Sequence, residues 1–122
     1  MSQVHLYRLP NGRAPYEEYL NVVAESGAKQ EAAKIRAYIS KLAELGSAGM
    51  ARQEWAKKLN DVWELRLGPH RVFYFWDEEN QRYVLLNGFR KRTPKTPRSE
   101  IERAERLRQS YLDHIKKEGE YD

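Results

Sequence analysis

The chain has 122 residues, the usual size of one domain, and a net charge of +4, so we expect a single domain over residues 1–122. It has no cysteine and three histidines, which excludes disulfides and thiolate zinc sites, and we expect neither a metal nor a cofactor. Because no segment approaches the roughly 20 apolar residues of a membrane span and no leader pattern opens the chain, we expect a cytoplasmic protein without membrane contact.

The first half predicts one strand and two helices. Alternation over Val4–Leu9 predicts a short strand, which Pro10 and the residues after it end. Pro15 suits the first turn of a helix whose apolar residues recur at helical spacing. Ser26-Gly27 interrupts that pattern, and a longer helix follows that we expect to stop at Gly46. For Ser47–Lys58, which mixes small and charged residues, we expect a loop.

The second half changes to a period of two. Three strands rich in aromatic and β-branched residues are predicted over Val62–Leu67, Arg71–Trp76 and Tyr83–Phe89, joined by loops short enough for an antiparallel meander. A last helix is predicted to begin near Ser99, at the spacing of a capping box. The expected fold is α+β, with a mainly antiparallel four-stranded sheet, two N-terminal helices packed on it and a C-terminal helix, in the order β-α-α-β-β-β-α.

Positive charge is concentrated in this second half. The segments 65–76 and 80–99 contain no acidic residue. They hold Arg66, Arg71, Arg82, Arg90, Lys91, Arg92, Lys95 and Arg98. Such a distribution indicates either a surface that attracts a polyanion such as nucleic acid or merely a solvated basic face.

Strand alternation predicts which of these cations lie together. If Leu65 enters the core, Arg66 points to the other side of the sheet, and a tight hairpin brings Arg71 beside it. Lys91 and two aromatic residues, Phe73 and Phe89, are candidates for the same face. Guanidinium groups would then bind phosphate oxygens and a ring would stack on a base, unless the face is only solubilised by its cations.

The residues of the second half resemble a known family. The run Trp63-Glu64-Leu65-Arg66, the aromatic strand from Arg71, and the ending Phe89-Arg90-Lys91-Arg92-Thr93 with Lys95-Thr96-Pro97 occur in order. This pattern resembles the phage-derived HigB-like branch of the RelE/ParE toxin superfamily. The first half is similar only in its expected architecture.

The resemblance implies the toxin of a type II toxin–antitoxin pair, an endoribonuclease that cuts mRNA on the ribosome and is held inactive by an antitoxin protein. We expect that antitoxin to be a helix-turn-helix protein. In such enzymes the ribose 2′-hydroxyl attacks its own scissile phosphate without a metal, and cations stabilise the transition state. The free toxin is expected to be a monomer. Two alternatives stay open, which are a ParE-like inhibitor of DNA gyrase and a regulatory module that binds nucleic acid without catalysis.

Position by position, the resemblance implies that Arg71 lies against the scissile phosphate, that Lys91 supplies the basic residue at the end of the last strand, and that Arg66 assists. Two departures stand out: Glu64 occupies a place where RelE itself has a lysine, and Pro97 stands where that protein has a catalytic tyrosine. The acid–base roles assigned to residues of RelE therefore cannot be assigned to residues of this chain.

Other residues are candidates for proton transfer and for binding the RNA. His70, beside Arg71 in the expected hairpin loop, is the candidate base, and the alternative is a turn histidine in solvent. Glu64 is either a base or the ion-pair partner of Arg66 or Arg71. We expect three further cations to bind flanking phosphates. These are Arg90, Arg92 and Lys95.

Overall fold

A computed structural model describes the backbone of residues 2–121 and the side chains of residues 2–115. Five strands and three helices follow one another along this part of the chain. The strands are β1 (Gln3–Leu6), β2 (Ala56–Leu59), β3 (Val62–Leu67), β4 (His70–Asp77) and β5 (Arg82–Arg90), and the helices are α1 (Pro15–Glu25), α2 (Lys29–Arg52) and α3 (Arg98–Tyr121). No helix within residues 2–121 is both long and apolar enough to cross a membrane.

The strands form one sheet in the order β1-β5-β4-β3-β2. All neighbours are antiparallel except β1, which pairs with β5 in the parallel sense. The predicted α+β class with a mainly antiparallel sheet is therefore confirmed. The predicted number of four strands is wrong, because β2 adds a fifth at the edge next to β3.

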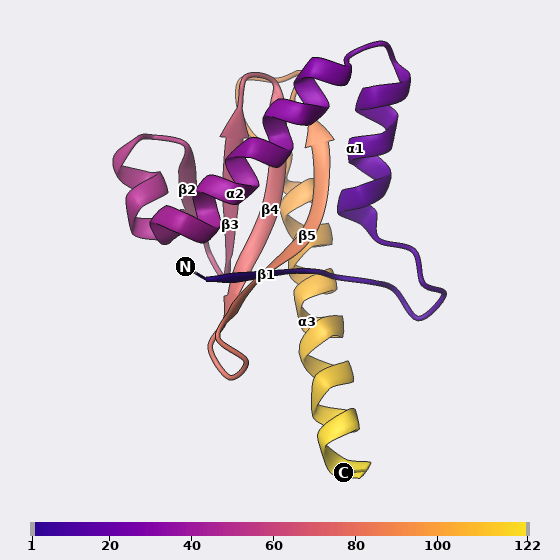
Figure 1. Ribbon diagram of the computed structural model, residues 1–122. Coiled ribbons are helices and arrows are strands. Elements are labelled where there is room, and N and C mark those ends of the chain that lie inside the picture. Colours follow the sequence, from indigo (N-terminus) through magenta and orange to yellow (C-terminus); the bar gives the residue numbers. More distant parts are fainter. Residues whose placement is uncertain (1, 122) are drawn as a thin grey trace.

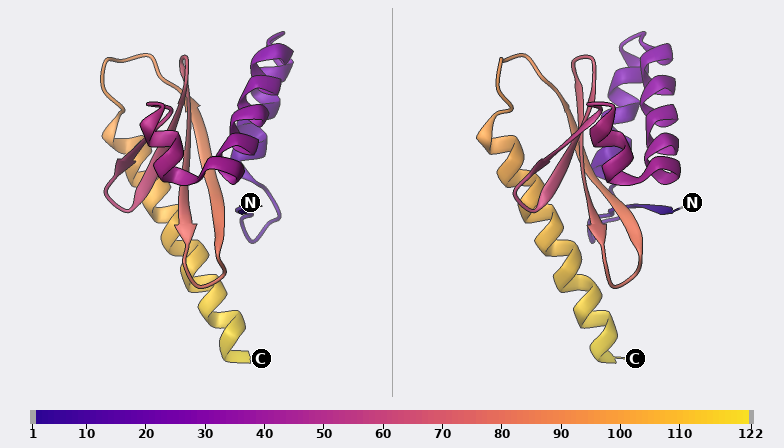
Figure 2. Two further views of the ribbon diagram at one scale, coloured as in Figure 1. Left: turned by 60° about the vertical axis from the view of Figure 1, so that its left-hand side comes forward. Right: turned by 90° about the vertical axis from the view of Figure 1, so that its left-hand side faces the viewer.

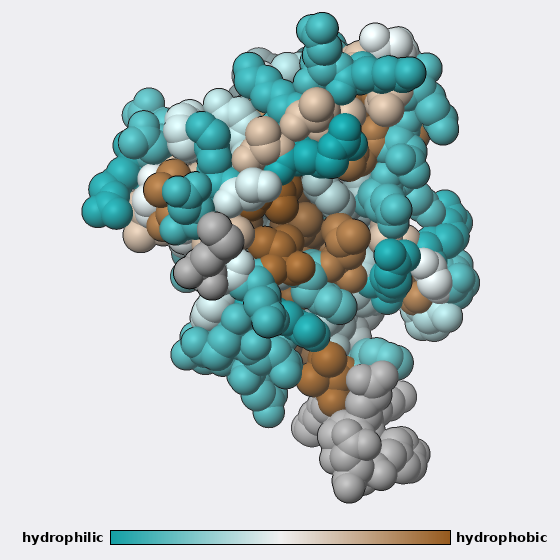
Figure 3. Space-filling view, in the orientation of Figure 1, coloured by the Kyte–Doolittle hydropathy of each residue, from teal (hydrophilic) through white to brown (hydrophobic). Residues whose placement is uncertain are grey.

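Helices cover both faces of the sheet (Figures 1 and 2). α1 and α2 pack on one face, where Leu20, Ile35 and Leu65 belong to one buried cluster. α3 crosses the other face, where Phe73 and Tyr111 belong to a second cluster. Figure 3 shows hydrophobic atoms gathered below α2, on the α1–α2 side, and hydrophilic atoms over the outer sides of the helices.

Gly46 marks a break in α2, as the sequence indicates, although it does not end the helix. Its φ of 74° lies in the left-handed region that glycine adopts without strain, and the backbone N–H of Ser47 then donates to the hydroxyl of Tyr83 at 3.0 Å. Helical structure resumes and continues to Arg52. The loop predicted over Ser47–Lys58 is therefore wrong at both ends, because helix occupies its first part and β2 its last.

Strand alternation sorts the side chains of β3 as predicted. Leu65 and Leu67 lie in the cluster under α1 and α2, whereas Val62 lies in the cluster under α3. Glu64 and Arg66, at even positions like Val62, therefore lie on the α3 side. On that side Arg66 therefore lies next to the hydrophobic core that α3 covers.

Candidate functional site

Arg66 and Arg71 face one another across the β3–β4 hairpin. They are register partners in the antiparallel ladder, and residues directly opposite in such a ladder project from the same side of the sheet. The connection between their strands is only Gly68-Pro69, with Gly68 at a φ of 58° that favours glycine. The predicted proximity of the two guanidinium groups is confirmed.

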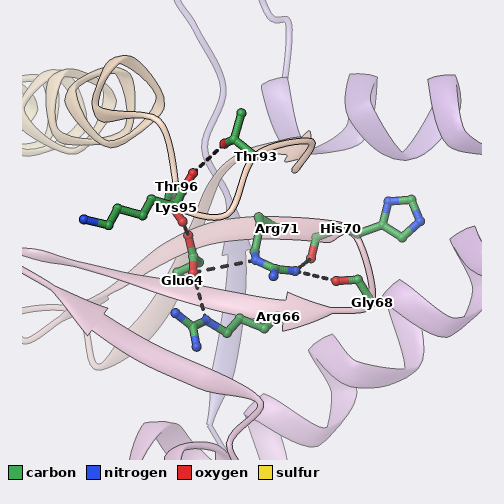
Figure 4. Close-up of polar contacts among 8 residues, drawn as sticks. All are labelled: Glu64, Arg66, Gly68, His70, Arg71, Thr93, Lys95 and Thr96. Atoms are coloured by element: carbon green, nitrogen blue, oxygen red, sulfur yellow. Dashed lines mark hydrogen bonds and ion pairs between the residues drawn. The ribbon is translucent and has the colours of Figure 1, made fainter.

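A buried carboxylate lies between the two arginines. The side chain of Glu64 is 0% exposed, and its Oε1 accepts a hydrogen bond from Arg66 Nε at 2.9 Å and lies 3.7 Å from Arg71 Nε. The hydroxyl of Thr96 donates to the second oxygen, Oε2. Figure 4 shows these contacts converging on Glu64. We call Glu64, Arg66, Arg71 and Thr96 the Glu64 cluster, and it confirms Glu64 as the ion-pair partner of both arginines.

Arg71 is the more tightly held of the two arginines. Its Nη1 donates to the carbonyl oxygens of Gly68 at 2.6 Å and His70 at 2.9 Å, and its side chain is only 12% exposed. Burial lowers the pKa of Arg71 from its usual value, while the Glu64 carboxylate opposes that shift. Because a guanidinium remains charged near neutral pH, Arg71 presents a positive charge that is partly withdrawn from water and fixed in direction.

The end of β5 and the segment after it complete the surroundings of the cluster. The backbone N–H of Lys91 donates to the carbonyl oxygen of Pro69 at 2.7 Å, which holds Lys91 beside the hairpin turn. The hydroxyl of Thr93 donates to the carbonyl oxygen of Lys95 at 2.6 Å, and Thr96 reaches Glu64. This segment therefore crosses close to the cluster, with the side chain of Lys95 exposed (Figure 4).

His70 does not lie where the sequence placed it. It is the first residue of β4, is 4% exposed, and points away from Glu64 (Figure 4). Its Nδ1 lies 2.5 Å from the hydroxyl of Tyr19 and its Nε2 lies 3.0 Å from Glu31 Oε1. The predicted position in the hairpin loop and the alternative of a turn histidine in solvent are both wrong, because His70 begins β4 and strand alternation sends it to the face covered by α1 and α2. A role as the base beside Arg71 has no support in this position.

Phe73 is also wrong as a predicted RNA contact. Its side chain is 0% exposed within the cluster under α3, so no base can reach its ring. Phe89 is half-buried and stacks on Phe73, with ring centroids 5.6 Å apart and an interplanar angle of 20°. One face of Phe89 is thus already occupied, and its role toward RNA stays a prediction.

Arg90 and Arg92 lie apart from the Glu64 cluster. Both line a cavity of about 300 Å³ on the α1–α2 side, together with Tyr19 and His70. Arg90 is the register partner of His70, so the two side chains share that face. The sheet therefore lies between Arg90 on one face and the three cations on the other, which are Arg66, Arg71 and Lys91.

One cation near the cluster was missed by the sequence-based prediction. Lys57 in β2 is exposed and is the register partner of Glu64, so its side chain projects from the same side of the sheet. Asn60-Asp61 forms the two-residue connection from β2 to β3, and Asn60 has a φ of 56°. That pair of turn-forming residues before Val62 was the available signal for a hairpin.

Within the part of the chain that the structure describes, no three His, Asp or Glu side chains are grouped so as to hold a metal ion. The chemistry that the Glu64 cluster offers is that of two fixed guanidinium groups, which donate hydrogen bonds to oxyanions in a planar fork.

Comparison with known proteins identifies the family. The family described as Phage derived protein Gp49-like (DUF891) matches residues 26–109. Among curated proteins none matches significantly. A chain in the crystal structure of the toxin-antitoxin complex RelBE2 from Mycobacterium tuberculosis is 17% identical, with a TM-score of 0.44, over 74% of this chain and 98% of that chain. Because the family match spans well over half of the sequence and includes the entire Glu64 cluster, this chain belongs to the phage-derived Gp49-like family, which confirms its resemblance to the RelE/ParE superfamily.

Proposed function

We propose that this protein is the toxin of a type II toxin–antitoxin pair and acts as an endoribonuclease on mRNA at the ribosome. The observation that carries the proposal is the pair Arg66 and Arg71, held on one face by the buried carboxylate of Glu64. Lys91 lies at the neighbouring strand end, beside the same hairpin turn. Three strands thus bring three cations to one end of the sheet, in a family of RelE-like toxins.

The proposed reaction begins with attack of a ribose 2′-oxygen on the adjacent phosphorus. The bond from phosphorus to the 5′-oxygen of the next nucleotide breaks, which leaves a 2′,3′-cyclic phosphate and a 5′-hydroxyl. The 2′-hydroxyl gives up a proton and the leaving 5′-oxygen takes one, so protons balance. An extra negative charge develops on the phosphoryl oxygens between these events, and fixed cations stabilise it.

Arg71 is the residue best placed to stabilise that charge. Its Nη1 is engaged by two backbone carbonyls, so its orientation is set before any substrate binds. Arg66, with its side chain 36% exposed, is the more accessible partner. Two guanidinium groups anchored on one carboxylate leave a net positive charge, which favours a dianionic transition state over a monoanionic ground state.

We do not propose either of the residues considered on sequence alone for proton transfer. His70 faces away, and Glu64 is buried beneath donors from Arg66 and Thr96. Neither is positioned to accept the proton of a 2′-hydroxyl. We therefore assign to the protein chiefly charge stabilisation and positioning, and we propose that the ribosome supplies the alignment of the mRNA strand.

The proposed partners follow from the same function. The antitoxin is a second protein that neutralises the toxin, and a small reading frame next to this one is expected to encode it. Lys95 and Phe89 remain proposed RNA contacts on the side of the Glu64 cluster. Arg90 and Arg92 are proposed to contact phosphates that pass around the end of the sheet to its other face.

The test compares Arg71→Ala with the wild type in a bacterium where each is induced. We expect growth arrest with mRNA ends phased to codons in the wild type, and a loss of cleavage of about 10²–10³-fold in Arg71→Ala, the usual cost of removing one fixed donor. Lys58→Ala is the matched control, because Lys58 is an exposed cation in β2 whose register partner, Trp63, lies on the α1–α2 side. It should cleave as the wild type does.

Other outcomes would identify other functions. Arrest with intact mRNA and altered DNA supercoiling would contradict the proposal and indicate a gyrase inhibitor. Absence of arrest, with soluble folded protein in the cell, would indicate a regulatory module. Purified ribosomes and a defined mRNA then separate ribosome-dependent cleavage from cleavage of free RNA.

A further inference from the structure

A second basic cavity lies at the opposite end of the sheet. It has a volume of about 260 Å³ and is lined by residues of β1, β5 and α3 and by Arg8. Arg82 begins β5 and Arg90 ends it, eight residues apart, so this cavity lies roughly 26 Å along the strand from the His70 end. The basic and hydroxyl side chains that line what we call the Arg82 pocket are His5, Tyr7, Arg8, Arg82, Tyr111 and His114.

Arg82 is fixed in this pocket before any ligand binds. Its Nε and Nη2 both donate to the hydroxyl of Tyr111, at 3.1 and 2.6 Å, and its guanidinium lies over the Tyr111 ring, 5.7 Å from the centroid. Its side chain is partly buried. A guanidinium held in this way loses little conformational freedom when it binds an anion.

The nearest carboxylate is shared among several donors and offsets the charge of Arg82 only in part. Asp77 accepts a hydrogen bond from the Tyr111 hydroxyl at 2.5 Å and two from Asn80, at 3.2 and 2.9 Å. Its distance to Arg82 Nε is 3.8 Å, which is an ion pair without a hydrogen bond. Asp77 is buried and does not line the pocket, and none of the described side chains that do line it is a carboxylate.

The environment of His5 reports the sign of the field in the pocket. Its pKa is lowered first by burial and then by the charges of Arg82 and Arg8, with Asp77 opposing. Arg8 also lies 3.6 Å from Glu17, but both side chains are about half exposed, so that pair is weak. A positive field that reaches a half-buried imidazole favours the entry of an anion.

We propose that the Arg82 pocket binds a phosphate group, presented either by a free phosphate compound or by the backbone of RNA. Arg82 donates to the phosphate oxygens. Arg8 and the two histidines, which come from two further segments of the chain, line the rest of the phosphate site. The pocket volume admits a phosphate with part of an attached sugar. This site is separate from the Glu64 cluster, and its existence does not depend on the nuclease function.

The three histidines allow a direct test in the whole protein. Imidazole signals in two-dimensional NMR spectra are followed while inorganic phosphate, adenosine monophosphate or a short single-stranded oligoribonucleotide is added at constant pH and ionic strength. We expect His5 and His114 to shift with a bound ligand, and we expect His70, at the other end of the sheet, to remain unchanged with inorganic phosphate and adenosine monophosphate. Shifts with phosphate and the monophosphate indicate a free ligand, whereas shifts with the oligonucleotide alone indicate an RNA backbone contact.

Variants show whether the shifts come from the proposed residues. Arg82→Gln should weaken binding by roughly tenfold or more, because a charge-assisted hydrogen bond is lost. Arg8→Ala, at an exposed position that should not disturb the fold, should weaken it by a smaller factor, and Lys58→Ala should leave it unchanged. The proposal is overturned if His5 and His114 move no more in phosphate and oligonucleotide than in chloride, or if Arg8→Ala and Arg82→Gln both bind as the wild type does while the His70 signal shows an intact fold.

Discussion

His70 and Arg71 are adjacent in the chain and lie in entirely different environments. His70 enters the face covered by α1 and α2, where both ring nitrogens contact helix side chains. Arg71 enters the face crossed by α3, where it contacts backbone carbonyls and a buried carboxylate. One step along β4 therefore separates a histidine held by two helices from a guanidinium held by the β3–β4 turn and by Glu64.

The two environments differ in how their polar groups are satisfied. Because an ionised carboxylate only accepts, His70 Nε2–H donates to Glu31 Oε1, and in the tautomer without a proton on Nδ1 that nitrogen accepts from the Tyr19 hydroxyl. Every polar atom of that imidazole is used. In the Glu64 cluster two cations share one carboxylate, so positive charge remains. The comparison predicts that the contacts of His70 affect stability but not cleavage, whereas the Glu64 cluster affects both, because its buried carboxylate holds two cations.

The largest effect on stability is expected from the carboxylate beneath the arginines. Glu64→Gln keeps the size of the side chain but leaves Arg66 and Arg71 without a counter-charge, and breaking such a buried pair costs about 3–5 kcal/mol. Unfolding in urea measures the free energy. Glu31→Gln, on the opposite face and about half exposed, is the matched control and should cost much less. Equal losses in the two variants would contradict the distinction between the faces.

Strand alternation was enough to predict which side chains of β3 and β4 share a face. Hydrophobic and polar residues alternate through Trp63-Glu64-Leu65-Arg66, so the core side identifies the other side. The pairing of Arg66 with Arg71 followed from the tight turn between them. The same rule, applied to His70, would have sent it away from Arg71, but the residue was expected in a loop, where no alternation applies.

Partners far apart in the sequence were beyond the reach of local patterns. Tyr19 and Glu31 lie on separate helices, 51 and 39 positions from His70, and only the packed fold brings them together. Likewise the sequence of β2 is not typical of a strand, because two of its four residues are lysines. This segment is a strand because it pairs with β3. The prediction of an open sheet face around Phe73 was wrong for a similar reason, because α3, at the end of the chain, covers that face.

His70→Ala should be the next largest change, and it should affect stability without abolishing cleavage. The substitution removes a 4% exposed side chain and leaves Tyr19 and Glu31 without their shared partner, which costs about 2–3 kcal/mol. Urea unfolding gives the loss, and mRNA cleavage is compared at a temperature where the variant is still folded. Cleavage that disappears while the variant remains folded would show that His70 acts in the reaction.

Tyr19→Phe should have a smaller effect of the same kind. It deletes one hydroxyl that donates to His70 Nδ1 at 2.5 Å and retains the ring, which packs against Gly88. We expect a loss of about 1 kcal/mol, typical of a neutral hydrogen bond whose partner stays buried. Tyr38→Phe is a matched control on α2, because the hydroxyl of Tyr38 makes none of the described hydrogen bonds. A loss in Tyr19→Phe no larger than in this control would show that the contact with His70 contributes nothing.

The smallest effect on stability is expected from Glu31, and it should appear only as a change of stability with pH. The hydrogen bond from His70 Nε2 holds the pKa of Glu31 below its usual value of 4.5. A lowered carboxyl pKa stabilises the fold above that usual value, and the contribution is lost as the pH falls through the folded pKa. Thermal unfolding of wild type and Glu31→Gln is therefore expected to differ slightly near neutral pH and to converge as the pH is lowered below about 4. A difference that grows on acidification would mean that Glu31 is ionised unfavourably in the fold, and the assignment of the proton to His70 Nε2 would then be wrong.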